Sequence, residues 1–309
     1  GTRPLPFNEA GGDVGMFAGG SPDLELIQTI NISSTGNANK FGDLTTGRRQ
    51  FAGGFSNKTR SLSANGYDGG SPGYPAIIEY VEFATQGNSA HFGDTTAGGE
   101  TGGAFANNTR GVTALGVASP AIVNTVEYVT IATLGNTADF GNLTVARCQE
   151  AGLSSNVRGL IGGGKTPSLS DVIDYVTISS VGDFTDFGNL SLARSEVASS
   201  NSSTRGVFLG GASPNTSTAN DTIDYITIAT TGNASDFGNL TTATRGLHGS
   251  VASNTIRGCI GGGATPSTTN VIEYVTIAST GNATDFGDLI VSTNNVAASA
   301  NGHGGLTGG

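Results

Sequence analysis

The chain has 309 residues, and its composition favours a folded protein made of strands rather than helices. Its 50 glycines and 9 prolines together fall short of the roughly 25–30% typical of structureless low-complexity chains. Only 12% of the residues are charged, and 24 acidic against 14 basic residues give a formal net charge of −10. Because this charge repels a phosphate backbone, we expect no nucleic-acid partner. No apolar stretch approaches the roughly 20 residues that span a bilayer, so we also expect no membrane insertion.

A pattern of about 50 residues, marked by a Phe-Gly pair, recurs along the whole chain. Its six phenylalanines are Phe41, Phe92, Phe140, Phe187, Phe237 and Phe286. The chain is therefore interpreted as one domain of six units with a remainder. The units are 1–46, 47–97, 98–146, 147–193, 194–244 and 245–292, and the remainder is 293–309.

Each unit predicts four short strands. Segments that end in a glycine doublet or its remnant lie at 16–20, 66–70, 112–116, 160–164, 207–211 and 259–263. Runs rich in Ile, Val, Tyr and Thr follow at 27–33, 78–84, 126–132, 173–179, 223–229 and 272–278. These runs are too short for helices and are bounded by Gly, Asn, Ser and Pro, which is typical of strands. The Phe-Gly segment and a later Ser/Ala/Gly-rich segment complete each unit.

The strings LIGGG, IDYVTIS and DFGNLSLAR resemble the kelch repeat in their glycine doublet, acidic residue before Tyr, later aromatic residue and terminal Arg. The chain departs from that repeat because Phe replaces Trp, Val or Ile follows the Tyr, and Thr29 replaces the first Tyr. The resemblance implies an all-β, kelch-like β-propeller of six four-stranded blades, with seven blades or a piece of a longer chain as alternatives. We expect a strand near 294–301 to pair with the first unit, which closes the ring and leaves no sheet edge open.

Repeats of the TGNATDFG type are similar to those in predicted tail-fibre and structural proteins of marine bacteriophages. This resemblance implies a non-enzymatic structural or adhesion module of a virion, extracellular in location, that presents loops to a host-surface glycan or protein. Its other partners are then virion proteins, and further copies of the chain in a homo-oligomer. One alternative is a kelch-type protein–protein interaction platform. Another is a carbohydrate-active propeller enzyme, which needs two converging carboxylates such as Glu82 and Glu100.

Loops that follow the glycine doublets differ between units, and in a propeller they emerge on one face. Since binding sites are grafted onto folds, we expect ligand-binding residues in these loops. Exposed tyrosines offer a flat stacking surface, and Asn and Asp offer hydrogen bonds. The candidates are Tyr67, Asp68, Tyr74, Lys165, Asn215 and Asn220.

Charged residues also recur at fixed places in the repeat. The arginines are Arg60, Arg110, Arg158, Arg205 and Arg257 after an Asn turn, and Arg48, Arg147, Arg194 and Arg245 after a run of small residues. The acids before the Tyr position are Glu79, Glu127, Asp174, Asp224 and Glu273. We expect ion pairs that fix strand packing, with an anion-binding ring as the alternative.

Residues typical of catalysis or metal binding are scarce. His91, His248 and His303 lie at unrelated positions in different units, so we expect no transition-metal site and no cofactor. Calcium bound by repeated acids such as Asp285 and Asp288 stays open as an alternative. Cys148 and Cys259 are too few for a disulfide framework and are interpreted as small packing residues.

Overall fold

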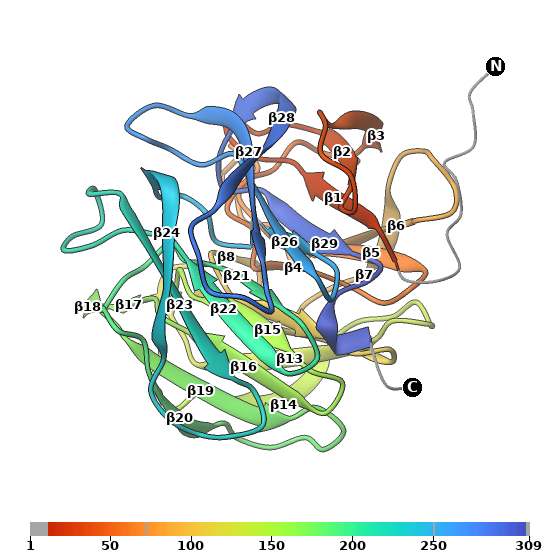
Figure 1. The fold of residues 1–309 in the computed structure, drawn as a ribbon. Helices are drawn as coiled ribbons and strands as arrows, with labels where there is room; N and C mark the ends of the chain where they lie inside the picture. The colour runs from red at the N-terminus through yellow and green to blue at the C-terminus, as the bar shows by residue number, and fades with distance from the viewer. Residues whose placement is uncertain (1–11, 72, 250, 307–309) are drawn as a thin grey trace.

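The computed structural model describes residues 12–71, 73–249 and 251–306. These residues form six four-stranded antiparallel sheets in a propeller-like arrangement (Figure 1). The only helical segment among them is the 3-10 helix η1 (Gly304–Leu306). The predicted all-β class is therefore confirmed.

We number the sheets 1 to 6 and give their strands in hydrogen-bonding order. Sheet 1 contains β29 (Ala297–Ala300), β1 (Val14–Ala18), β2 (Leu26–Asn31) and β3 (Asn39–Asp43). Sheet 2 contains β4 (Gly53–Ser56), β5 (Arg60–Ala64), β6 (Ile78–Glu82) and β7 (Ala90–Gly93). Sheet 3 contains β9 (Ala104–Ala106), β10 (Arg110–Ala114), β13 (Thr125–Thr130) and β14 (Ala138–Asn142).

The other three sheets have the same order. Sheet 4 contains β15 (Ala151–Ser154), β16 (Arg158–Gly162), β19 (Val172–Thr177) and β20 (Thr185–Asn189). Sheet 5 contains β21 (Ala198–Asn201), β22 (Arg205–Leu209), β23 (Asn220–Thr227) and β24 (Ser235–Thr244). Sheet 6 contains β25 (Val251–Ser253), β26 (Arg257–Gly261), β27 (Thr269–Thr276) and β28 (Thr284–Thr293). Short strands in the loops are β8 (Gly99–Glu100), β11 (Val117–Ala118), β12 (Ala121–Ile122), β17 (Lys165–Thr166) and β18 (Ser168–Leu169).

Both ends of the described chain meet in sheet 1. Strand β29 pairs antiparallel with β1, so that Ala300 faces Gly15 and Ala297 faces Ala18. This confirms the pairing expected between the strand near 294–301 and the first unit. The first strands of the six sheets contact one another in sheet order. The contacting pairs are β29 with β4, β4 with β9, β9 with β15, β15 with β21, β21 with β25, and β25 with β29. These first strands lie in the middle of the molecule in Figure 1, with β20, β24 and β28 at its periphery.

The hydrophobic core lies between neighbouring sheets. Leu153 and Phe187 of sheet 4, for example, pack in one cluster with Phe208 and Ile226 of sheet 5. Within a sheet, the tyrosine of the third strand meets the phenylalanine of the Phe-Gly pair edge to face, as Tyr175 meets Phe187 with ring centroids 5.9 Å apart. The repeated aromatic residues are thus packing residues, which accounts for their fixed spacing.

The glycine of each Phe-Gly pair lies against the next sheet. A Cβ atom built on Gly42 would overlap the carbonyl oxygen of Gly87, and the equivalent glycines meet their neighbours in the same way. The Asn beside the contacted glycine caps the outer strand, since Asn88 Oδ1 accepts a hydrogen bond from Asp43 N at 3.1 Å. Because backbone packs directly on backbone here, no side chain fits at this position.

Buried ion pairs join the sheets at three of the repeated arginines. The pairs are Arg48–Glu79, Arg147–Asp174 and Arg194–Asp224, and every side chain in them is at most 1% exposed. The expectation of ion pairs is confirmed for these three. Because these three guanidinium groups are buried and already paired, they cannot bind anions from solvent as the alternative of an anion-binding ring requires.

The other repeated arginines do not form buried ion pairs of this kind, and only Arg245 and Arg60 have an acidic partner in the described part of the chain. Arg245 is not in the buried position, which Thr244 occupies, and its guanidinium lies 3.6 Å from Glu196. The five arginines after the Asn turn stack on the sheet's own tyrosine, with distances from Cζ to the ring centroid of 4.5–5.0 Å. They also donate hydrogen bonds to backbone carbonyls of the next sheet, as Arg158 does to Ile228 O at 3.0 Å. Of these five, only Arg60 also has an acidic partner within 4 Å among the described residues, Glu82 at 3.6 Å.

Candidate functional site

One face of the molecule carries the loops that join the second and third strands of each sheet. We call it the loop face; its loops are 19–25, 65–77, 115–124, 163–171, 210–219 and 262–268. The segments that lead from one sheet into the first strand of the next lie at the same face. The opposite face carries the short Asn turns and the segment after β29.

A series of backbone hydrogen bonds runs along the loop face from sheet to sheet. It joins six segments that each contain one residue with a left-handed φ of 53° to 69°: Gln50, Thr101, Gln149, Glu196, Gly246 and Asn295. At Gly246, the main-chain donor to Glu196 O is the next residue, Leu247. Gln149 N donates to Thr101 O at 2.6 Å, and Glu196 N donates to Gln149 O at 2.9 Å. Gln50 N donates to Asn295 O at 3.0 Å, which links the last of these residues to the first. Since five of the six are not glycine, this strained conformation is held by the surrounding structure.

Buried polar groups lie beside this series. Glu150 is fully buried at a position where two other sheets have Val197 and Val296, and neither of its carboxylate oxygens makes a hydrogen bond of normal geometry. Burial raises the pKa of Glu150 to about 8, although nearby Arg147 opposes the shift. His248 is 3% exposed, and neither ring nitrogen has a partner among the described residues. Burial lowers its pKa, so the imidazole is neutral at pH 7.

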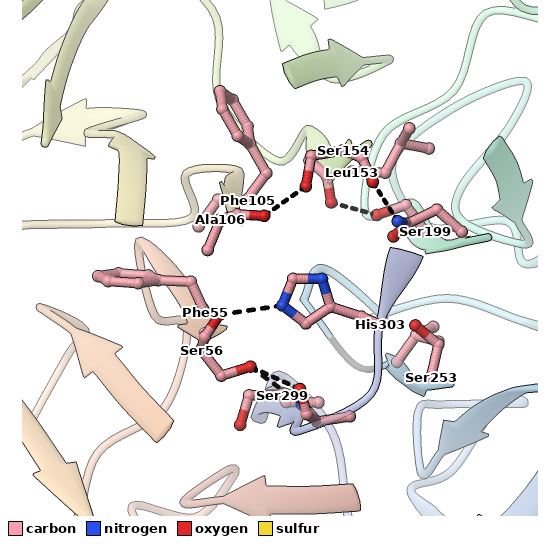
Figure 2. Close-up of a pocket in the computed structure, with 17 residues that line it drawn as sticks. Phe55, Ser56, Phe105, Ala106, Leu153, Ser154, Ser199, Ser253, Ser299 and His303 are labelled. Atoms are coloured by element: carbon pink, nitrogen blue, oxygen red, sulfur yellow. Dashed lines mark hydrogen bonds between the residues drawn. The ribbon is translucent and has the colours of Figure 1, made fainter. Parts of the chain in front are cut away.

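Small cavities lie among the first strands at the centre of the molecule, and the one drawn in Figure 2 has a volume of about 50 Å³. Figure 2 shows the ring of His303 pointing toward Ser56, whose carbonyl oxygen lies 2.9 Å from His303 Nε2. His303 Nδ1 accepts a hydrogen bond from Gly305 N at 3.2 Å, so Nε2 carries the proton. Burial lowers the pKa of His303 to about 4. The cavity has room for one or two water molecules and not for an organic ligand.

An aromatic cluster occupies the loop face over sheet 2. The rings of Tyr67 and Tyr74 have centroids 5.3 Å apart, and Arg49 Cζ lies 4.7 Å from the centroid of Tyr67. Arg49 also pairs with Asp23 of the neighbouring loop at 2.7 Å, with both side chains 27% exposed. Asp68 Oδ1 accepts a hydrogen bond from Gly70 N at 2.8 Å, which shapes the same loop. We call Asp23, Arg49, Tyr67, Asp68, Tyr74 and Glu100 the tyrosine cluster.

Glu100 connects this cluster to Lys165 of sheet 4. Burial raises the pKa of Glu100, while the positive charges of Arg49 and Lys165 oppose the shift. The negative charge of Glu100 is in turn the main cause that raises the pKa of Tyr74. Four charged or aromatic groups from different loops therefore interact electrostatically across the loop face.

Three of the six predicted ligand-binding residues, Tyr67, Asp68 and Tyr74, thus lie in one loop of sheet 2, and Lys165 is related to them only through its charge interaction with Glu100. Asn215 and Asn220 do not lie there, since they belong to sheet 5. Asn215 Oδ1 accepts hydrogen bonds from its own loop, including Ser217 N at 2.9 Å, and Asn220 Oδ1 accepts one from Thr222 N.

Sequence reasoning missed Arg49 and Asp23 as members of this cluster. A signal was present, because Arg49 follows Arg48 and no other unit has two consecutive arginines. From the sequence, Glu100 is a candidate only as a catalytic carboxylate together with Glu82. Glu82 lies 3.6 Å from Arg60 at the end of β6 remote from the loop face, so Glu82 and Glu100 do not converge on one site.

In the described part of the chain, no three His, Cys, Asp or Glu side chains come together in a way that holds a metal ion. Both cysteines are buried and unpaired; burial is the main cause that raises the pKa of each thiol to about 12. Of the described segments, none is a helix long and apolar enough to cross a membrane. Comparison with protein-family models and with curated protein sequences finds no match to this chain. The tyrosine cluster is therefore interpreted from its own geometry.

Proposed function

We propose that this chain is a closed, kelch-like propeller of six blades that acts as a non-enzymatic binding module on a virion or another extracellular surface. Its binding surface is the tyrosine cluster on the loop face, and its ligand is a glycan or a protein of a host surface. Other virion proteins and further copies of the chain are its structural partners.

Three series of contacts support the closed ring of six. The first strands touch in order from β4 to β29, and β29 touches β4. The segments that contain the left-handed residues are linked by main-chain hydrogen bonds, with Leu247 N as the donor to Glu196 O, and the link from Gln50 to Asn295 joins sheet 2 to the segment before β29. At the periphery, Gly36 N of sheet 1 donates to Phe286 O of sheet 6 at 2.8 Å. Because β29 completes sheet 1, we favour six blades over seven.

The tyrosine cluster is the observation that carries the binding function. Two partly exposed aromatic rings beside Arg49, Asp68 and Glu100 combine a stacking surface with charged hydrogen-bonding groups, which is the usual chemistry of sugar and peptide recognition. Rigid support favours binding, since less motion is lost when the ligand arrives. Arg49 supplies that support by stacking on Tyr67 while it pairs with Asp23.

The separation of Glu82 from Glu100 favours binding over glycan hydrolysis, which needs two carboxylates about 5–10 Å apart around one bond. The viral setting rests on the similarity of the TGNATDFG repeats to those of predicted bacteriophage fibre proteins. An antibody to the chain, used for immunogold microscopy of virions from its source, tests that setting. Label on intact particles supports it, and label confined to the soluble fraction of infected cells overturns it.

Binding itself is tested with an array of bacterial surface polysaccharides, together with whole host cells as a probe for protein receptors. We expect the native chain to bind, and the double variant Tyr67→Ala, Tyr74→Ala to lose at least about 10-fold in affinity, because aromatic anchors dominate such sites. Asn215→Ala is the matched control, since Asn215 is exposed on the same face but belongs to sheet 5. Equal loss in the control, or full binding by the double variant, would overturn the assignment of the site.

A further inference from the structure

The position seven residues after the phenylalanine of each Phe-Gly pair is occupied in two ways. Three units place Arg48, Arg147 and Arg194 there, and the other three place Gly99, Thr244 and Thr293. Each arginine pairs with the residue before the Tyr position of the next sheet, which is Glu79, Asp174 or Asp224. For Gly99, Thr244 and Thr293, the equivalent positions of the next sheet hold Glu127, Glu273 and Gln28.

Arg194 shows how the position is used when an arginine is present. Its Nη2 donates to Asp224 Oδ2 at 2.9 Å and to the carbonyl oxygen of Phe208 at 3.3 Å, and its Nη1 donates to the carbonyl oxygen of Thr222 at 2.6 Å. Ser191 N donates to the same carboxylate oxygen of Asp224 at 3.1 Å. One carboxylate and two carbonyl groups thus surround the guanidinium.

The equivalent place between sheets 5 and 6 is a cavity of about 190 Å³. Thr244, which stands where the arginine would be, lines the cavity together with Glu273, which stands where Asp224 does. Glu273 Oε2 accepts a hydrogen bond from Thr241 N at 3.1 Å, as Asp224 accepts one from Ser191. The carboxylate is therefore held in the same way as its counterpart, without the guanidinium.

The two carbonyl positions are preserved as well. Ile260 lies three residues after Arg257, as Phe208 lies three residues after Arg205, and Val271 lies two residues before Glu273, as Thr222 lies two before Asp224. Both Ile260 and Val271 line the cavity. The residues equivalent to the three that hold Arg194 therefore all line the cavity.

The charge of Glu273 has no cationic partner within 4 Å among the described residues. Arg245, the next residue after Thr244, is directed toward Glu196 instead. The other two units without arginine do not leave an equivalent carboxylate with so few partners. Gln28 is neutral, and Glu127 receives an additional hydrogen bond from Thr137 Oγ1 at 2.6 Å. Only Glu273 combines a buried carboxylate with this cavity, since it is 8% exposed and lines the space.

We propose that this cavity binds an external guanidinium group. A planar guanidinium matches one carboxylate and two carbonyl acceptors, and its hydrogen bonds to a carboxylate are charge-assisted. Leu240 and Ile260 provide apolar wall for an alkyl stem. Thr241 and Thr242 are exposed at the rim, so the ligand reaches the cavity from solvent. The source is an arginine side chain of a partner protein or a small alkylguanidinium compound.

The test is a titration of the purified full chain with ethylguanidinium chloride, followed by calorimetry and by chemical shifts of nearby amides. Ethylurea is the neutral probe of similar shape, and sodium chloride at equal concentration controls for ionic strength. We expect saturable binding of ethylguanidinium at least about 10-fold tighter than that of ethylurea, since the charged group pairs with Glu273. Equal affinity for the two probes would overturn the proposal.

Two variants locate the site. Thr244→Arg places an internal guanidinium in the cavity, so it is expected to abolish ethylguanidinium binding and to raise the melting temperature. Asn215→Arg adds the same charge at an exposed position of sheet 5 and is expected to keep binding. Glu273→Gln is expected to lose binding; if it fails to fold, Thr244→Arg decides. Unchanged affinity in Thr244→Arg would refute the site.

A third probe, N-acetylarginine N-methylamide, distinguishes the sources. Affinity equal to or above that of ethylguanidinium supports an arginine of a partner chain, and loss of affinity restricts the cavity to small guanidinium compounds. The site is independent of the tyrosine cluster. The variant Tyr67→Ala, Tyr74→Ala is therefore expected to bind ethylguanidinium normally even where it has lost its surface ligand.

Discussion

The pair Arg48–Glu79 allows the value of a buried charge pair to be measured against a natural replacement in the same chain. Both side chains are 1% exposed. Removal of one partner from a buried pair typically costs about 3–5 kcal/mol, because the other charge stays buried without compensation. We expect Arg48→Thr and Glu79→Gln each to lower the free energy of unfolding by about 3 kcal/mol. The lower end applies to Arg48→Thr because Thr45 N and Ser89 Oγ still donate to Glu79 at 3.0 and 3.1 Å, and to Glu79→Gln because Arg48 Nη1 still donates to Asn65 O.

The double variant has the same residue types as Thr293 and Gln28, which occupy the equivalent positions of the repeat. No charge is then left unpaired, so the cost falls to about 1–2 kcal/mol for lost packing and a lost hydrogen bond. The two single costs add to about 6 kcal/mol, which gives a coupling of at least about 4 kcal/mol between the two sites. A double variant as unstable as the sum of the single variants would refute this reasoning.

Urea denaturation followed by far-ultraviolet circular dichroism is the suitable assay. Guanidinium chloride is avoided because the proposed cavity binds that ion. Equal slopes of free energy against urea concentration are needed for the comparison, since a changed slope indicates a changed unfolding transition.

Three further predictions concern single residues. Glu150 has a pKa of about 8 when folded and about 4.5 when unfolded, so the free energy of unfolding falls as pH rises between these values. We expect Glu150→Val to remove this dependence and to raise the free energy of unfolding at pH 9 by at most about 5 kcal/mol, measured by urea titration. Buried His303 has a pKa of about 4 when folded and 6.5 when unfolded, so the free energy of unfolding falls as pH drops from 6.5 to 4. We expect His303→Gln to lose that dependence, and an unchanged acid transition in this variant would contradict the assignment. Gly42→Ala is expected to lower the melting temperature strongly because its Cβ overlaps Gly87 O, whereas Gly87→Ala, with open space around it, should change the melting temperature little.

The fold could largely be predicted from the sequence because the repeated residues have local preferences for strands or turns. Strand-forming runs and glycine doublets predicted the strands, and the Ala-rich segment near the end of the chain predicted the pairing of β29 with β1. The role of the arginines after the Asn turn was predicted correctly only for Arg60, which pairs with Glu82. Arg158 and its counterparts instead stack on tyrosines and donate to carbonyl groups, and neither interaction leaves a signal of opposite charge in the sequence.

The candidate site was only partly predictable. Tyr67 and Tyr74 stood out because they depart from the repeat, whereas Arg49 and Asp23 become neighbours only when the loops of two sheets meet. The cavity beside Glu273 could be recognised only by comparing the six units at the arginine position. In the sequence, Arg245 directly follows Thr244 and suggests that this unit also has the buried arginine, whereas Arg245 pairs with Glu196.

The loops between the third and fourth strands have a consequence for behaviour in concentrated solution. The outermost strand of a sheet usually exposes unpaired backbone groups, which invite pairing with another chain and aggregation. Here each of the six outermost strands receives a backbone hydrogen bond from the neighbouring sheet, as Gly135 N donates to Phe92 O of β7 and Ser89 N donates to Asp43 O of β3. A chain with so few charges and so many strands thereby protects the edges most prone to misassembly, although only one of these strands, β3, carries a lysine, Lys40.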